Sequence, residues 1–217
     1  MAFSLTQTWM EEETQNMRVV WSEIINDVTK HVRNLNVPDI DKWLEKVLQY
    51  NVSEKNLHGL IVIYAYKSIS PNEQQTENNI HLARILAWCM EMAIAYIVTL
   101  DDIVDQSLFR RGQPCWYRRN DTGLMAINDG SLVQSTVYYL IEKHFEGKEC
   151  YNNLVKTFQQ AIFKTQIGQF LDLTSTFKKC NLDQFTMERF NAIAKCKTEH
   201  GIYFLPTLLA MHFVSLL

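Results

Sequence analysis

Glycine and proline are scarce in this sequence, with only 7 and 4 residues among 217. Sheets with tight turns depend on such residues, and a sustained alternation of apolar and polar residues is missing as well. Hydrophobic residues make up 47% of the chain, which is enough for a substantial core. We therefore predict one all-α domain over residues 1–217, without internal repeats or a low-complexity linker.

The sequence also lacks a CxxC pair, an apolar signal-peptide core and a long apolar run. Its cysteine count, five, is odd, which favours reduced thiols over a disulfide framework or a zinc site. The longest apolar stretch, Met92–Leu100, is too short to cross a bilayer, and the acidic run Glu11–Glu13 argues against a mitochondrial presequence. With a net charge of −3, we expect a cytoplasmic protein without a membrane span or a nucleic-acid partner.

Apolar residues that recur every three or four positions predict a succession of helices, with breaks marked by Pro38, Pro71 and Pro114. The expected helices cover residues 4–33, 39–50, 54–69, 77–107, 122–146, 150–175, 183–195 and 197–217. The segment 77–107 is the most informative, because its apolar stripe continues into Asp101 and Asp105. A core-facing row that ends in carboxylates breaks the usual pattern, and such breaks tend to mark functional sites.

Asp101 and Asp105 stand one helical turn apart and should share one face, with Asp102 about 100° around the helix. Clustered carboxylates repel one another, and Mg²⁺ relieves this repulsion while it bridges to phosphate oxygens. Five residues later come Arg110 and Arg111, whose planar guanidinium groups match phosphate. We interpret this segment as a magnesium-dependent diphosphate clamp, although an acidic helix end and an arginine pair that both face water would give the same pattern.

The segment from Asp101 to Arg118 combines DDxxD with RRGQ-CWY, and it resembles the farnesyl diphosphate synthase family. Other family-like segments follow in the same order: Ala126–Asp129, Thr165–Leu173, Lys197–Thr198 and Phe204–Pro206. The similarity runs from about residue 15 to the end and looks closest to insect-type and animal-type trans-isoprenyl diphosphate synthases, a family that includes the insect terpene synthases derived from it. It implies a helical bundle around a central cavity and, as a further expectation, a homodimer.

The resemblance also implies roles for individual residues. Metal binding, of up to three Mg²⁺, falls to four carboxylates: Asp101, Asp102, Asp105 and Asp172. Contact with diphosphates falls to four basic residues, Arg110 and Lys197 for the allylic substrate and Lys55 and Arg111 for isopentenyl diphosphate. Thr198 and Gln169 would lie near the carbocation. For Gln169 and Asp172, a buried hydrogen-bonded pair without a catalytic role is the alternative.

Product length has a local signal before the first aspartate. Ile97 and Ile94 lie one and two turns before Asp101 on the same face, with Tyr96 nearby, so we expect them to line the pocket floor. The family commonly has two aromatic residues at positions 96 and 97, whereas Ile97 is smaller here. That difference indicates a deeper or reshaped pocket, and ordinary core packing explains these residues equally well.

Three positions depart from the family pattern in the half that binds isopentenyl diphosphate. Leu57 stands where the family has Asn, His58 where it has Arg, and Ile94 where it has Gln. We therefore expect a magnesium-dependent enzyme that ionises geranyl or farnesyl diphosphate as an insect-type terpene synthase. The alternative is a prenyltransferase, farnesyl or geranyl diphosphate synthase, that joins isopentenyl diphosphate to an allylic diphosphate.

The end of the sequence suggests a third possibility. The family has a second aspartate-rich motif downstream of the segment that contains Pro206, and this sequence stops at Leu217 before such a motif. We therefore expect an incomplete domain whose C-terminal part is missing. On that expectation, the second alternative to a terpene synthase is a fragment or an inactive, truncated paralogue.

Overall fold

The computed structural model describes residues 6–37, 39–52, 56–176 and 185–214, and these residues are almost entirely helical. The prediction of an all-α protein is therefore confirmed. The elements are α1 (Gln7–Asn34), α2 (Ile40–Asn51), α3 (Leu57–Ile69), η1 (Asn72–Gln74), α4 (Glu77–Val104), β1 (Phe109–Arg110), β2 (Gln113–Pro114), η2 (Trp116–Arg118), α5 (Met125–Phe145), α6 (Tyr151–Thr176), α7 (Met187–Ile193), η4 (Ala194–Phe204) and α8 (Leu205–Val214).

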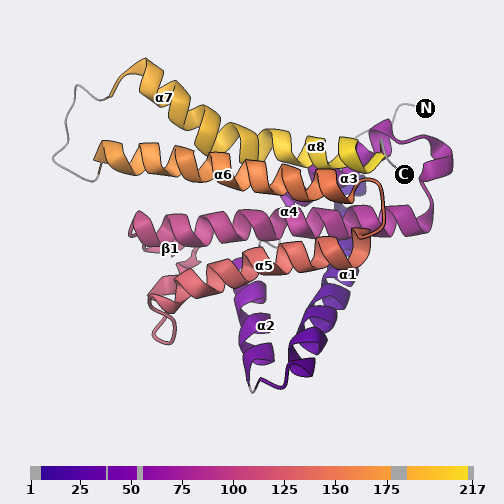
Figure 1. Cartoon of the computed structure of the whole chain (residues 1–217), viewed down its shortest axis with the longest axis horizontal. Helices are drawn as coiled ribbons and strands as arrows, with labels where there is room; N and C mark the ends of the chain where they lie inside the picture. The colour runs from indigo at the N-terminus through magenta and orange to yellow at the C-terminus, as the bar shows by residue number, and fades with distance from the viewer. Residues whose placement is uncertain (1–5, 38, 53–55, 177–184, 215–217) are drawn as a thin grey trace.

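Helix α4 is the centre of the molecule and packs against α1, α2, α3, α5, α6 and α8 (Figure 1). It begins after Thr76, whose hydroxyl accepts the Asn79 N–H at 3.2 Å, as an N-cap does. It ends at Val104, earlier than the predicted residue 107, because Gln106 adopts a left-handed φ of 54°. This end places Asp101, Asp102 and Asp105 of the sequence motif at the C-terminal end of the central helix.

By length and composition, α4 alone among the described helices is apolar enough to cross a membrane. Its 18-residue window has a mean hydropathy of 1.5, although the longest apolar run within it is the short stretch Met92–Leu100. The window is 83% buried within the protein, as in the core helix of a globular fold. The stripe of small and large apolar residues that predicted a buried face thus covers nearly the whole circumference of the helix.

Helix α6 lies beside a long, continuous helical segment made of α7, η4 and α8 (Figure 1). We predicted a break between residues 195 and 197, but the chain stays helical there and widens into the π-helix η4. Pro206 is accommodated directly after η4, in the first turn of α8, where a missing backbone N–H costs little. π-Helical turns of this kind are rare and are often found at functional sites.

The cysteine prediction is confirmed for the part of the chain that the structure describes. Cys89, Cys115, Cys150 and Cys196 are all free thiols, and the first three are buried. Burial raises the pKa of the Cys89 thiol well above its usual value. Cys180 lies outside the described residues.

Candidate active site

The carboxylates of the DDxxD motif occupy the last turn of α4. Asp101 and Asp102 belong to the helix, and Asp105 caps it by donating its backbone N–H to the Asp101 carbonyl at 2.9 Å. Burial raises the pKa of Asp105, and the nearby negative charges of Asp101 and Asp172 raise it further. Asp101 and Asp105 therefore share a face, as predicted, and their charges repel one another.

Lys197 supplies the positive charge that this cluster needs. Its Nζ lies 3.2 Å from Asp101 Oδ1 and 2.6 Å from Asp172 Oδ2. Burial alone would lower the pKa of Lys197, but the hydrogen bond to Asp172 and the charge of Asp101 outweigh burial and raise it. Gln169 Nε2 completes the group by donating to Asp105 Oδ1 at 3.4 Å. Residues from α4, α6 and η4 thus meet at one point, although they are far apart in sequence.

A glycine on α6 allows this meeting. A Cβ added at Gly168 would lie 2.2 Å from the backbone nitrogen of Lys197, which is far closer than atoms can approach. Gly168 therefore lets α6 and η4 touch through their backbones and brings Lys197 within reach of Asp172. Thr198 follows Lys197 in η4 and is half-buried. Sequence reasoning missed Gly168, although a glycine inside a predicted helix is a recognised sign of close packing.

Arg110 pairs with the second aspartate. Its Nε lies 3.0 Å from Asp102 Oδ1, its Nη2 lies 2.5 Å from the same oxygen, and a weaker contact reaches Asp101 Oδ2 at 3.5 Å. The Asp102 side chain is only 5% exposed, so this pairing neutralises a buried charge. The sequence predicted that Asp102 shares the metal and that Arg110 holds diphosphate, whereas here the two side chains bind each other.

Arg110 and Arg111 lie on a small antiparallel hairpin that is fixed by contacts with α2 and α5. Strand β1 pairs with β2, and the turn between them uses left-handed φ angles of 53° at Arg111 and 79° at Gly112. The hairpin continues into Trp116, whose indole N–H donates to Asp129 at 2.8 Å. Asp129 also accepts the indole N–H of Trp43 at 2.8 Å. This buried carboxylate, which sequence reasoning did not single out, ties the arginine hairpin to α2 and α5.

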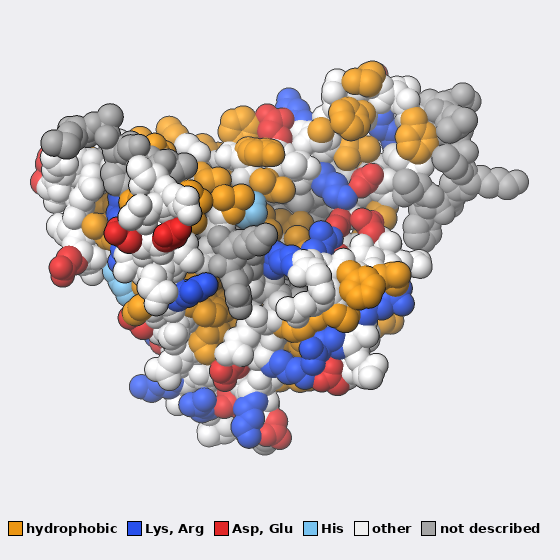
Figure 2. Space-filling view, turned by 180° about the vertical axis from the view of Figure 1, so that it is seen from behind, with side chains coloured by type: hydrophobic (Ala, Val, Ile, Leu, Met, Phe, Trp, Pro, Cys, Tyr) orange, Lys and Arg blue, Asp and Glu red, His pale blue; other side chains and the backbone are white. Residues whose placement is uncertain are grey.

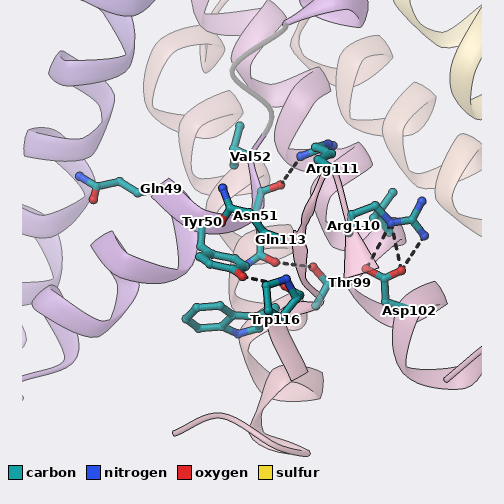
Figure 3. Close-up of a pocket in the computed structure, with 12 residues that line it drawn as sticks. Gln49, Tyr50, Asn51, Val52, Thr99, Asp102, Arg110, Arg111, Gln113 and Trp116 are labelled. Carbon is teal, nitrogen blue, oxygen red and sulfur yellow. Dashed lines mark hydrogen bonds and ion pairs between the residues drawn. The ribbon is translucent and has the colours of Figure 1, made fainter. Parts of the chain in front are cut away.

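A cavity of about 280 Å³ opens beside the hairpin (Figure 3). Asp102, Arg110, Arg111, Thr99 and Asn51 contribute polar groups to its wall. Arg111 Nη1 donates to the Asn51 carbonyl at 3.1 Å, and burial lowers the pKa of Arg111. The cavity therefore holds two guanidinium groups in a partly enclosed space, which suits a bound phosphate.

The residues that depart from the family pattern have different surroundings. Leu57 is 54% exposed, and Ile94 is buried in the core. His58 Nδ1 lies 3.6 Å from Glu91 Oε2, and Glu91 also accepts the Gly59 N–H at 2.8 Å. Lys55, which the sequence assigned to the same half of the site, lies outside the described residues.

A second cavity, of about 230 Å³, opens on the Asp101 side of α4. Its wall is mostly apolar and comes from α4 and α6: Tyr96, Ile97, Leu100, Asp101, Val104, Thr165, Gln166, Gln169, Phe170 and Leu173. Tyr96 and Ile97 line it, as the sequence indicated, whereas Ile94 is not among the lining residues. Asp101 therefore faces an apolar cavity and Asp102 faces the arginine cavity, on two sides of the same helical turn. Figure 2 shows acidic and basic side chains gathered in a recess bordered by apolar ones.

The carboxylates suit Mg²⁺, although they are not arranged as a preformed metal site. Among the described residues, no group of three or more His, Cys, Asp or Glu side chains could hold a metal as placed here. Asp101 Oδ1 is buried beside Lys197 Nζ at 3.2 Å, and the pKa of Asp105 is raised by burial and by its acidic neighbours. An oxygen-only donor set with excess negative charge fits a hard divalent cation. Asp101, Asp105 and Asp172 are the residues that would hold it.

Comparison with known proteins places this geometry in a family. The sequence model of the Polyprenyl synthetase family matches residues 41–216. The chain belongs to the polyprenyl synthetase family. It is 39% identical over 211 residues to "Farnesyl pyrophosphate synthase" of Murgantia histrionica, which covers 97% of this chain and 51% of that protein. It is 36% identical over 216 residues to "Farnesyl pyrophosphate synthase" of Gallus gallus, covering 98% and 59%.

Solved structures agree with the sequence comparison. The crystal structure of T. Brucei farnesyl diphosphate synthase superposes with a TM-score of 0.88 at 27% identity, covering 93% of this chain and 62% of that one. The family resemblance and the isoprenoid synthase-type helical fold are thereby confirmed. The chain spans about half the length of the curated polyprenyl synthetase relatives named above. The roles of individual site residues stay predictions.

Proposed function

We propose that this chain forms the part of a prenyltransferase that binds an allylic diphosphate, ionises it and joins it to isopentenyl diphosphate. One observation carries the proposal: Lys197, Asp101 and Asp172 form a charged cluster at the entrance of an apolar cavity. A prenyl diphosphate has the same division, with a charged head and an apolar tail. The head would lie at the cluster, and the tail would lie between α4 and α6.

In this proposal the basic side chains bind the leaving group. Lys197 and Arg110 would exchange their carboxylate partners for diphosphate oxygens, which they bind with charge-assisted hydrogen bonds. Mg²⁺, when bound by Asp101, Asp105 and Asp172, would supply further positive charge that stabilises the departing diphosphate. The apolar wall around Leu100 excludes water, which would otherwise capture the cation. Thr198 and Gln169 would face the carbon end of the breaking bond.

The arginine cavity is the proposed site of isopentenyl diphosphate. It lies on the other side of the same helical turn, so its ligand would approach the ionised carbon from the Asp102 side. Arg111 offers the guanidinium group for the second diphosphate. The names of the relatives, farnesyl pyrophosphate synthases, also favour prenyl transfer over terpene formation. We propose a homodimer on the family resemblance alone.

A terpene synthase is the second candidate, favoured by one specific observation. His58 lies against Glu91, which is buried, instead of reaching toward a phosphate as a longer Arg side chain would. Leu57 and Ile94 likewise offer no polar group. If the arginine cavity no longer binds isopentenyl diphosphate, the cation would lose a proton or cyclise instead. Both candidates share the ionisation step at Asp101 and Lys197.

The deciding experiment uses protein expressed from the full reading frame that contains this chain. Geranyl or farnesyl diphosphate is supplied with Mg²⁺, with and without isopentenyl diphosphate, and diphosphate and volatile products are analysed separately. Prenyl transfer predicts longer diphosphates that appear only with isopentenyl diphosphate. The variant Asp101→Asn should lower turnover by about 100-fold or more, because the negative charge of the departing diphosphate would be stabilised less in the transition state.

The other outcomes separate the alternatives. Hydrocarbons or alcohols made without isopentenyl diphosphate, and lost in Asp101→Asn, would replace prenyl transfer by terpene synthesis. No product with either substrate would favour an inactive paralogue. An exposed lysine on α6, Lys156, gives a control, since Lys156→Ala should leave product and rate unchanged.

A further inference from the structure

The carboxylate of Asp129 in α5 is buried between two indole rings. Its Oδ1 accepts the N–H of Trp43 from α2 at 2.8 Å, and its Oδ2 accepts the N–H of Trp116 at 2.8 Å. Asp129 is 1% exposed, and both of these donors are uncharged. Burial of a carboxylate between uncharged donors is costly, and proteins tend to keep such a group where it serves a site.

Trp116 connects Asp129 to the hairpin that carries Arg110 and Arg111. It directly follows the hairpin in the chain, is 2% exposed and lines the arginine cavity (Figure 3). Within the hairpin, Gln113 of β2 lies opposite Arg110 of β1. A displacement of Trp116 therefore passes along β2 and across the strand pair to the two arginines.

The same hairpin is also held from the end of α2. The Tyr50 hydroxyl donates to the Pro114 carbonyl at 2.7 Å, and Arg111 Nη1 donates to the Asn51 carbonyl at 3.1 Å. All four of these residues line the arginine cavity. The contact of Asp129 reaches the hairpin from α5 instead, so the hairpin is held from two directions.

We propose that Asp129 is a positioning residue for isopentenyl diphosphate, because through Trp116 it holds the hairpin with the Arg111 guanidinium in the arginine cavity. This inference rests on the proposed function, since it takes that cavity as the site of isopentenyl diphosphate. Loss of the carboxylate frees Trp116, the hairpin shifts, and Arg111 binds the diphosphate less well. Asp129 is not among the residues that line the cavity, so it acts without touching the substrate.

The test compares the affinities of two ligands, measured by calorimetry on protein expressed from the full reading frame. Isopentenyl diphosphate alone probes the arginine cavity, and the unreactive thiolodiphosphate analogue of geranyl diphosphate, with Mg²⁺, probes the apolar cavity. Asp129→Leu keeps a branched side chain and removes both acceptors. It should weaken isopentenyl diphosphate about threefold to tenfold more than the analogue, the range that one lost hydrogen bond gives. The analogue is affected less, because Lys197 and Mg²⁺ also hold it.

The two indoles provide a matched pair of variants that shows whether Asp129 acts through Trp116. Trp116→Phe removes the N–H on the hairpin side and should shift the affinity ratio as Asp129→Leu does. The double variant should shift it no further than either single one. Trp43→Phe makes the same chemical change on the α2 side and should leave the ratio within about twofold of the wild type, since Asp129 still accepts from Trp116.

Amide hydrogen exchange over residues 109–116, measured without ligand, reports on the hairpin itself. Exchange should be faster in Asp129→Leu and Trp116→Phe than in the wild type and Trp43→Phe. The Cys115 N–H, which donates to the Leu108 carbonyl at 3.0 Å, then opens more often. If Asp129→Leu does not fold, Asp129→Ser replaces it with the same expectation, because its shorter side chain leaves room for water to accept both indole N–H groups.

The outcomes separate this inference from the proposed function. If the wild type binds both ligands and Asp129→Leu leaves their affinity ratio unchanged, the role of Asp129 is overturned and the proposed function stands. Additive shifts in the double variant, an equal shift in Trp43→Phe, or unchanged hydrogen exchange overturn that role as well. A wild type that binds the analogue but not isopentenyl diphosphate overturns prenyl transfer together with this inference and leaves the terpene synthase. A wild type that binds neither ligand overturns the proposed function and this inference with it.

Discussion

At the residue scale, two basic side chains neutralise the carboxylates at the end of α4. Arg110 is paired with Asp102, and Lys197 is paired with Asp101 and Asp172. The sequence predicted these residues as neighbours, and the structure brings them together. What the sequence could not indicate is that the basic residues neutralise the carboxylates directly. This pairing depends on contacts between elements that are distant in the chain, and a motif carries no information on them.

The pairing predicts a competition between Lys197 and Mg²⁺. Replacing Lys197 by Met leaves Asp101, Asp105 and Asp172 without their own cation, so their mutual repulsion increases. Mg²⁺ alone, without substrate, should then bind about tenfold more tightly than to the wild type. The rise in Tm on addition of Mg²⁺ measures this, with Lys156→Met as the control. A rise no larger than that of the wild type would show that Lys197 does not compete with the metal.

At the element scale, the contact between α6 and η4 positions the charged cluster. Besides Gly168, a second glycine lies at this contact, because a Cβ at Gly201 would lie 2.9 Å from Thr165 Oγ1. Arg189 of α7 adds hydrogen bonds to the end of α6, to Ser175 Oγ at 2.6 Å and to the Leu171 carbonyl at 3.0 Å. The two helical segments are therefore fixed along their length, and the π-helix lies where their backbones approach most closely.

Substitution of Gly168 tests this arrangement. Gly168→Ala places a methyl group where the Lys197 backbone lies, so η4 must move and Lys197 must leave Asp101. We expect a loss of turnover of about 100-fold, as for a catalytic group displaced by an ångström, with about 1–3 kcal/mol of destabilisation. Gly147→Ala is the control. The φ of 80° at Gly147 strains any residue with a Cβ, so this variant also loses stability, but no atom lies within 4 Å of the added Cβ and no neighbour has to move. Equal loss of turnover in both variants would mean that Gly168 matters only for stability.

The elements themselves could largely be predicted from the sequence, since long apolar stripes determine most helices. α4 and α6 begin and end within a few residues of the predicted positions. The expected break near residue 196 was wrong, because the pattern of apolar residues there is interrupted by the charged and polar residues of η4. Local periodicity cannot distinguish an interrupted helix from a π-helix whose polar residues face a site.

At the scale of the whole molecule, a buried ion-pair group joins three helices. Glu13 of α1 lies 2.8 Å from Lys67 Nζ of α3 and 2.5 Å from Arg84 Nε of α4. Burial would raise the pKa of Glu13, but the hydrogen bonds from Arg84 and Lys67 outweigh it and lower the pKa below the ordinary value of 4.5. The acidic run in the sequence gave no sign that one of its members is 2% exposed.

This group predicts how stability depends on pH. A carboxylate with a lowered pKa stabilises the folded state fully above pH 4.5, and the contribution is lost as the pH falls through the lower, folded value. Glu13→Gln should therefore cost about 3 kcal/mol near neutral pH, because it leaves Lys67 and Arg84 unpaired. Denaturant unfolding of both proteins over a pH series measures the difference. A difference that stays constant below pH 4.5 would show that Glu13 is not ionised in the fold.

The last turn of α4 separates two cavities with adjacent residues, since Asp101 faces one and Asp102 the other. The two cavities share no lining residue, so substitutions in the wall of the arginine cavity, such as at Asn51 or Gln113, leave the wall between α4 and α6 untouched. If the two substrates bind as proposed, recognition of isopentenyl diphosphate and accommodation of the allylic tail can therefore evolve separately on one scaffold. On the proposed function, descendants of one ancestral gene can lose the condensation step while they keep ionisation, and a protein engineer can alter either half independently.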